Sequence, residues 1–132
     1  PESALSSLNQ RNLQHFNITI DKQEIINVVR LDSWIESLED SCSPSVLKLD
    51  VEGHELSVLH GAEETLKSIA LVQFEFGGGN IDSKTYFQDF GYFFKSRDFD
   101  IYRLTPRGPK KIEKYAESLE VFRPTNYFAV RK

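Results

Sequence analysis

A chain of 132 residues, of which 39% are hydrophobic and 27% charged, has the size and composition of one folded domain, which we expect to span residues 1–132. Its formal net charge of −4 argues against nucleic acid as a partner, because phosphate binding needs a clustered cationic surface. The single cysteine, Cys42, excludes an internal disulfide framework and a cysteine-rich zinc site. No apolar run approaches the roughly 18 residues that cross a bilayer, and no secretory signal is visible. We therefore expect a cytoplasmic protein without a membrane partner.

The first part of the chain predicts little regular structure. Residues 1–27 form a polar lead-in. The alternation at 16–20 and the apolar run at 25–29 each predict a short strand. Four apolar residues at helical spacing then predict an amphipathic helix over 31–38. The chain contains no methionine, which together with elements missing from the fold predicted below suggests a fragment.

A strand, a helix and a second strand are predicted in the middle of the chain. Residues 46–51 and 71–76 read as two buried strands. Between them, leucines near helical spacing predict a helix that begins after Gly53 and breaks or kinks at Gly61. The glycine-rich stretch 77–80 predicts a flexible turn after the second strand.

The last third continues the alternation of strands and helices. A helix is predicted over 84–97, with its aromatic residues in the core, followed by strands at 99–104 and 126–131. Strands that alternate with helices predict an α/β fold with a mostly parallel sheet and helices on both faces. The final two strands have no full helix between them, which favours a hairpin and an antiparallel edge strand.

Three carboxylates are predicted to meet at one edge of this sheet. Asp50 and Glu52 lie at the end of the strand 46–51, and they would share a face if that strand stays extended through Gly53. Glu75 lies at the end of the neighbouring strand, and ligands of open parallel sheets bind outside the carboxyl ends of strands. Carboxylates there can accept hydrogen bonds from a ligand, act as a general base, or bind a hard cation. The alternative is that Glu52 only favours the start of a helix through the helix dipole.

Other polar residues carry weaker signals. His54 and His60 match no familiar zinc spacing, so we assign no metal site. The stretch 77–79 lacks the spacing of a phosphate-binding loop. The basic residues between 103 and 114 are typical of a solvated face, although they could attract an anionic substrate.

Six segments, in this order, resemble the FkbM-type methyltransferases: Val-Val-Arg-Leu-Asp-Ser-Trp (28–34), Leu-Lys-Leu-Asp-Val-Glu-Gly-His-Glu (47–55), Val-Leu-His-Gly-Ala (58–62), Val-Gln-Phe-Glu-Phe-Gly (72–77), Ile-Tyr-Arg-Leu-Thr-Pro (101–106) and Asn-Tyr-Phe-Ala-Val (126–130). The segment at 47–55 is the most specific of them, and the resemblance covers residues 28–132. It implies a class I methyltransferase fold, which is Rossmann-like, with S-adenosylmethionine as the methyl donor. It also implies transfer to a hydroxyl oxygen of a small molecule or a glycan.

The same resemblance assigns roles to the acidic residues. Asp50 would lie near the donor's methyl group or the acceptor, and Glu52 and Gly53 would shape the same wall. Glu75 would face the acceptor. Asp50 and Glu75 are thus the expected catalytic residues, and Asp50, Glu52 and Gly53 the expected donor-binding residues.

One part of the family's pattern is missing. In this fold the donor rests on a glycine-rich turn after the first strand and on an acidic residue that ends the second, and residues 1–45 show neither. We therefore expect the carboxyl-terminal part of the domain, without the first strands of the fold and with an exposed sheet edge through which copies could associate. We expect the methyl-transfer activity to belong to the parent protein, and this chain alone to hold the donor poorly. One alternative function is a non-catalytic module that self-associates and does not bind the donor. A metal-dependent hydrolase or lyase that uses Asp50, Glu52 and His54 is a further alternative.

Overall fold

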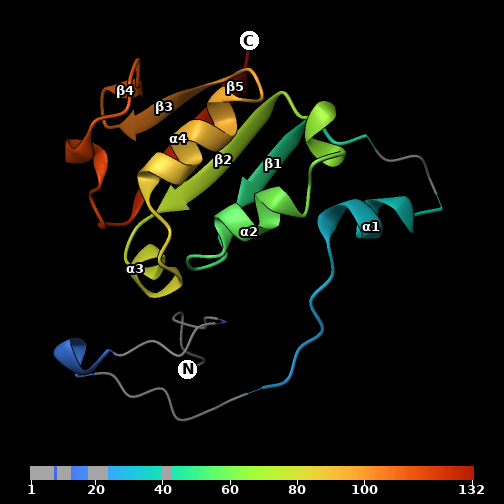
Figure 1. The fold of residues 1–132 in the computed structure, drawn as a ribbon, viewed down its shortest axis with the longest axis horizontal. Coiled ribbons are helices and arrows are strands. Elements are labelled where there is room, and N and C mark those ends of the chain that lie inside the picture. Colours follow the sequence, from blue (N-terminus) through green and yellow to red (C-terminus); the bar gives the residue numbers. More distant parts are fainter. Residues whose placement is uncertain (1–7, 9–12, 18–23, 40–42) are drawn as a thin grey trace.

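The computed structural model describes residues 8, 13–17, 24–39 and 43–132 (Figure 1). The helices are α1 (Leu31–Glu36), α2 (Glu55–His60), α3 (Gly79–Ser83) and α4 (Phe87–Lys95), with short 3-10 turns η1 (Gln14–Phe16), η2 (Thr65–Lys67) and η3 (Glu117–Leu119). The strands are β1 (Val46–Leu49), β2 (Leu71–Phe76), β3 (Phe99–Thr105), β4 (Gly108–Lys111) and β5 (Thr125–Arg131).

The strands form one mixed sheet in the order β1-β2-β5-β3-β4. In the described part of the chain β1 and β2 pair in parallel, whereas β5 pairs antiparallel with both β2 and β3, and β4 pairs antiparallel with β3. The α/β class is confirmed, but the prediction of a mostly parallel sheet is wrong. The reason is that β4 follows β3 after residues 106–107 alone, which makes the two an antiparallel hairpin, and that β5 runs opposite to both of its neighbours, β2 and β3.

The prediction that the last strand lies at the edge of the sheet is wrong. β5 pairs antiparallel with β3, as predicted, but it is inserted between β2 and β3, and β4 forms the antiparallel edge. Since β2 and β3 both run opposite to β5, the strands β1, β2 and β3 all point the same way. Their carboxyl ends therefore meet at one edge of the sheet, where β5 begins.

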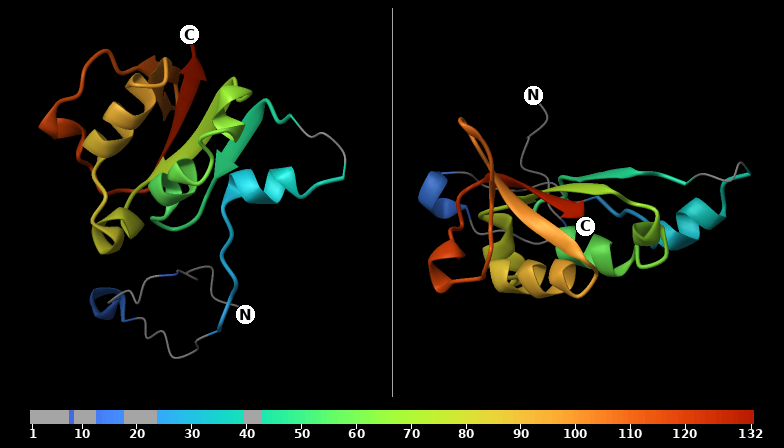
Figure 2. Two further views of the ribbon diagram at one scale, coloured as in Figure 1. Left: turned by 45° about the vertical axis from the view of Figure 1, so that its right-hand side comes forward. Right: turned by 90° about the horizontal axis from the view of Figure 1, so that it is seen from above.

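The helices α2, α3 and α4 lie on one face of the sheet, which the view from above shows most clearly (Figure 2). The expectation of helices on both faces is therefore wrong for the described residues. Side chains on the covered face are apolar and buried, and aromatic rings dominate them: Phe74 stacks on Phe90 with ring centroids 5.0 Å apart and on Tyr127 at 5.5 Å. The prediction that the aromatic residues of the helix at 84–97 are core residues is confirmed for its four phenylalanines, Phe87, Phe90, Phe93 and Phe94. It is wrong for Tyr86, which is more than half exposed.

Several predicted elements differ from the structure in local detail. Residues 25–29 form no strand, and of the strand predicted at 16–20 only Phe16 and Asn17 lie within the described residues, with Phe16 in η1. The glycine-rich stretch 77–80 leads directly into α3, because the Asn80 side chain accepts a hydrogen bond from the amide of Gly77 at 2.8 Å and closes a tight turn.

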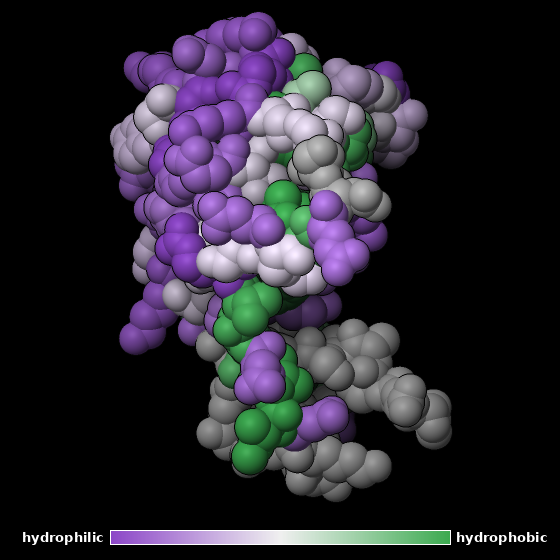
Figure 3. Space-filling view, turned by 90° about the vertical axis from the view of Figure 1, so that its right-hand side faces the viewer, coloured by the Kyte–Doolittle hydropathy of each residue, from purple (hydrophilic) through white to green (hydrophobic). Residues whose placement is uncertain are grey.

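The segment 24–30, which leads to α1, carries hydrophobic side chains on the surface. Ile25, Ile26, Val28 and Val29 are all more than half exposed, and Figure 3 shows this hydrophobic group on the extended segment beside the folded body. Within the described ranges no helix is long and apolar enough to cross a membrane.

Candidate functional site at the carboxyl edge of the sheet

Four acidic side chains gather where β1 and β2 end. β1 and β2 run in parallel register up to the pair Leu49 and Phe74, and one further step along that register places Asp50 alongside Glu75. The loop after β1 adds Glu52, and the first residue of α2 adds Glu55. The structure thus brings together the carboxylates that the sequence predicted at this edge, and it adds one.

Asp50 lies on the face of the sheet opposite to α2, α3 and α4 and is exposed to solvent. Its Oδ2 lies 3.3 Å from the Nζ of Lys48, and the two residues share that face because they are two positions apart on an extended strand. More than half of each side chain is accessible, so this ion pair is a weak surface contact that a ligand can displace.

Glu75 lies on the same face, half-buried near the end of β2. Burial raises the pKa of its carboxyl above the usual value, and the negative charges of Asp50, Glu52 and Glu55 raise it further. The residue paired with Glu75 on the neighbouring strand β5 is Asn126, whose side-chain oxygen accepts a hydrogen bond from Gln73. A carboxylate with a raised pKa is a better proton acceptor near neutral pH than an ordinary glutamate.

The loop between β1 and α2 turns sharply away from the strand. Glu52 has a φ of 52° and Gly53 a φ of 98°, so the backbone leaves the extended conformation directly after the strand. The expectation that Asp50 and Glu52 share a face along a continuous strand is therefore wrong, because β1 ends at Leu49. Positive φ is uncommon for a glutamate and occurs most often at sites where surrounding structure enforces it.

Gly53 packs backbone to backbone against the turn that follows β2. A Cβ atom added to Gly53 would lie 2.3 Å from the carbonyl oxygen of Gly79, and one added to Gly79 would lie 2.6 Å from the carbonyl of Glu52. Only glycine permits this approach at both positions. The contact ties the loop after β1 to the turn after β2, and therefore links the two strand ends that carry the acidic residues.

The fourth carboxylate at this edge is Glu55, for which the sequence predicted no role in the site. It is only 2% exposed, and its Oε1 accepts hydrogen bonds from the amides of Val51 at 3.1 Å and Gly53 at 3.3 Å. Its other oxygen, Oε2, is buried, and so is the Nε2 of the neighbouring His54; neither atom has a hydrogen-bond partner among the described residues.

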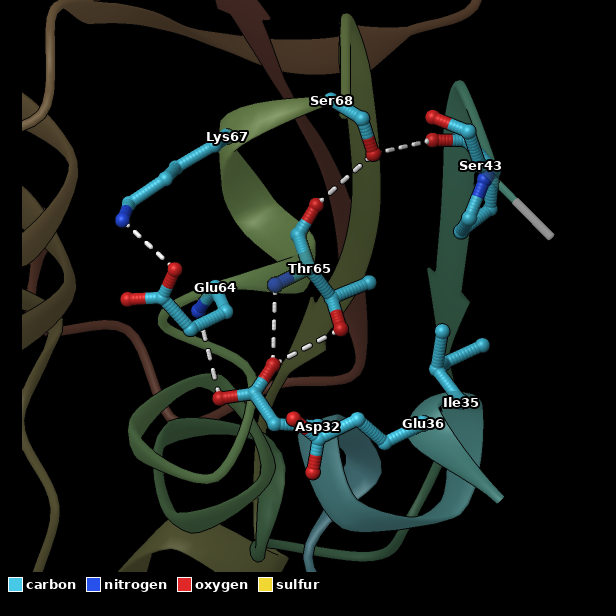
Figure 4. Close-up of a pocket in the computed structure, with 9 residues that line it drawn as sticks. Asp32, Ile35, Glu36, Ser43, Glu64, Thr65, Lys67 and Ser68 are labelled. Atoms are coloured by element: carbon cyan, nitrogen blue, oxygen red, sulfur yellow. Dashed lines mark hydrogen bonds and ion pairs between the residues drawn. The ribbon is translucent and has the colours of Figure 1, made fainter. Parts of the chain in front are cut away.

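Two cavities lie away from the acidic edge. One, of about 450 Å³, lies at the opposite edge of the sheet, between α1, η2 and the segment that enters β1, and is shown in Figure 4. The other is a shallow groove of about 400 Å³ between α2 and α4, lined by His60, Tyr92 and Arg97 among others. Among the described residues, no group of three or more His, Cys, Asp or Glu side chains is arranged to hold a metal ion.

Asp32 connects α1 to η2 beside the first cavity (Figure 4). Its carboxylate accepts hydrogen bonds from the amide and hydroxyl of Thr65, at 2.8 and 2.7 Å, and from the amide of Glu64 at 3.2 Å. Partial burial by itself raises the pKa of Asp32, but the hydrogen bonds from Thr65 and Glu64 outweigh that effect, and the pKa lies below its usual value. The side chain therefore has a structural role as a cap.

We expect Asp32→Ala to lower the free energy of unfolding by about 1–3 kcal/mol, because three hydrogen bonds to a charged group are lost. The depressed pKa means that this contribution is present above the pKa of the unfolded chain and disappears as the pH falls through the lower pKa of the folded chain. Urea unfolding at pH 7 and at acid pH measures both effects. Glu36→Ala, an exposed neighbour in the same cavity, is the control, and an equal loss in the two variants would contradict the cap.

The family model described as the methyltransferase FkbM domain matches residues 1–101 of this chain. No match to the chain was found among curated proteins or among solved structures. The matched span contains β1, α2, β2 and α4, and thus the whole acidic edge. It begins upstream of residue 28, where the resemblance in the sequence begins, and it ends before β4 and β5.

Proposed function

Because the chain belongs to the FkbM methyltransferase domain family, we propose that its acidic edge takes part in methyl transfer from S-adenosylmethionine to a hydroxyl oxygen of a small molecule or a glycan. The observation that carries this proposal is the convergence of Asp50, Glu52 and Glu75 at the carboxyl edge of parallel strands, with the pKa of Glu75 raised. That edge is the usual ligand position in open α/β sheets.

The residues present suit the proposed donor. S-adenosylmethionine carries two positive charges, on its sulfur and on its amino group, and would supply a methyl group bonded to the charged sulfur. Carboxylates are the side chains that best compensate such charges and accept hydrogen bonds from an ammonium group. The acidic edge offers several of them, and the nearby cation Lys48 is paired on the surface with Asp50.

We assign the donor side of the site to Asp50, Glu52 and Gly53. Asp50 is exposed at the strand end and can accept hydrogen bonds once its contact with Lys48 is displaced. Glu52 lies in a loop whose backbone is bent by two successive positive φ angles. Gly53 has no side chain, so it contributes backbone only.

We assign the acceptor side to Glu75. Its raised pKa suits a group that takes the proton of an attacking hydroxyl, because base strength rises with pKa. The rest of the task is alignment, in which the site holds the acceptor oxygen in line with the methyl carbon and the sulfur.

Calorimetric titration with S-adenosylmethionine tests this proposal. We expect saturable but weak binding by the chain, because residues 1–45 show no glycine-rich turn to hold the donor. Asp50→Ala should weaken this binding roughly 10- to 100-fold further, because a charge-assisted hydrogen bond is lost. Glu64→Ala, which removes an exposed carboxylate paired with Lys67, serves as the control and should bind as the unaltered chain does. Equal affinity of the Asp50→Ala and Glu64→Ala variants would remove Asp50 from the site.

A second candidate function is a non-catalytic module that self-associates through the edge of the sheet. The observation in its favour is that β1 pairs only with β2 among the described strands, and that Val46 at its start is 58% exposed. An unpaired strand edge is a template for another chain. Self-association in solution together with no donor binding in the calorimetric titration would favour this function over methyl transfer.

A further inference from the structure

We propose that Glu55 is a positioning residue, which holds the loop after β1 in the one conformation that presents Asp50 and Glu52 to the methyl donor. This inference rests on the proposed function. It assigns to Glu55 a role through other residues, since the Glu55 side chain is only 2% exposed and cannot itself touch a ligand in this conformation.

Glu55 fixes the loop through two hydrogen bonds to a single carboxylate oxygen. The amides of Val51 and Gly53 both donate to Oε1 of Glu55, at 3.1 and 3.3 Å. These amides flank Glu52, the residue whose φ of 52° is unfavourable for a glutamate. By satisfying the amides on both sides, Glu55 compensates the strain of the residue between them.

The position of this loop also affects the end of β2, where Glu75 lies. Gly53 lies against the backbone of Gly79 so closely that a Cβ atom on either residue would overlap the other. Gly79 follows Glu75 by one short turn. A shift of the loop after β1 must therefore either displace the turn after β2 or break its contact with that turn. Glu55 thus determines how Asp50 and Glu75 lie relative to one another, although it contacts neither by hydrogen bond.

Burying the charged side chain of Glu55 to fix a loop is energetically unfavourable. The Oε2 of Glu55 is buried without a hydrogen-bond partner among the described residues, and the same is true of the Nε2 of His54. Burial of an unpaired polar oxygen is unfavourable, and the negative charge also contributes to the raised pKa of Glu75. A side chain that only stabilised the loop would not need a buried charge. A side chain that also places negative charge beside a cationic donor would need one.

Two measurements on the same variants test the inference. Amide hydrogen exchange of Val51 and Gly53 measures whether their hydrogen bonds to Glu55 protect them. Calorimetric titration with S-adenosylmethionine measures whether losing these bonds lowers donor affinity. For Glu55→Ala we expect exchange at these two amides to accelerate about tenfold or more and donor affinity to fall about tenfold or more, since both hydrogen bonds are lost. Glu55→Gln retains a side-chain oxygen that accepts from both amides, so it should restore slow exchange and most of the affinity.

The controls separate this role from general stability and from the proposed function. Glu64→Ala should change neither quantity, because the Glu64 side chain pairs with Lys67 on the surface, away from the loop after β1. If Glu55→Ala does not fold, Glu55→Asp replaces it, because the shorter carboxylate cannot reach both amides. Fast exchange with unchanged donor affinity, or unchanged exchange, would overturn the inference. If the unaltered chain binds no donor, the proposed function fails, and the exchange rates alone then decide whether Glu55 holds the loop.

Discussion

Glu75→Gln is expected to lower the rate of methyl transfer about 10²- to 10⁴-fold, the usual contribution of a general base, while making the folded chain more stable at neutral pH. The two effects have one cause. Burial and three neighbouring carboxylates raise the pKa of Glu75, which makes it a stronger base and also makes its charged form unfavourable in the folded chain. Glutamine keeps the shape of the side chain and removes the charge.

The dependence on pH follows from the direction of that shift. The folded chain holds the Glu75 proton more tightly than the unfolded chain, so between the two pKa values stability falls as the pH rises. The stabilising effect of Glu75→Gln is therefore fully present above the raised pKa, and it disappears below the ordinary pKa of glutamate, where both states are protonated. The rate of methyl transfer with Glu75 in place should fall as the pH drops through the raised pKa.

Transfer of a labelled methyl group to a panel of hydroxylated small molecules and glycans measures the first effect, and thermal unfolding as a function of pH measures the second. Glu113→Gln, which removes an exposed carboxylate, is the control for both. A Glu75→Gln variant that retains full activity would exclude Glu75 as the base, and one that is less stable at neutral pH would contradict its unfavourable environment.

Gly53→Ala is expected to destabilise the chain by about 2–5 kcal/mol, a large part of the stability of a domain of this size. Alanine at a φ of 98° is strained, and its Cβ would lie 2.3 Å from a backbone oxygen that cannot rotate away. The loop after β1 and the turn after β2 would have to separate, so donor binding should be lost along with stability.

Gly91→Ala is the matched control, because an added Cβ meets nothing within 4 Å there and the residue lies within α4. Alanine favours a helix over glycine by about 1 kcal/mol, so this variant should gain stability. Urea unfolding of both variants gives the comparison. Similar stabilities for Gly53→Ala and Gly91→Ala would show that the close approach of Gly53 and Gly79 is not required.

The acidic edge was predictable because it depends on local pattern and one general rule of topology. The alternation in 71–76 fixed both ends of β2, and the rule that parallel strands end at one edge placed Asp50 near Glu75. The insertion of β5 between β2 and β3 was not predictable in this way. It results from a competition between long-range pairings, to which the residues of 125–131 contribute no distinguishing signal.

The role of Glu55 was hidden for a different reason. Glutamate is seldom fully buried, so nothing in a sequence marks one as an acceptor for backbone amides two and four residues away. The bend that creates those unpaired amides comes from the positive φ angles of Glu52 and Gly53, and a glutamate in that conformation is not expected from its residue type. Strand β4, with its proline and two lysines, likewise lacks the apolar alternation that predicts a strand.

The most direct test of the account is to map where S-adenosylmethionine binds, by following the backbone amide resonances of the chain during a titration. We predict that the amides that shift most are those of residues 50–55 after β1 and 75–80 at the end of β2. The amides around Asp32, at the opposite edge of the sheet, should stay unchanged. Shifts confined to the cavity beside α1 and η2, or to the groove between α2 and α4, would contradict the assignment of the methyl-transfer site to the acidic edge.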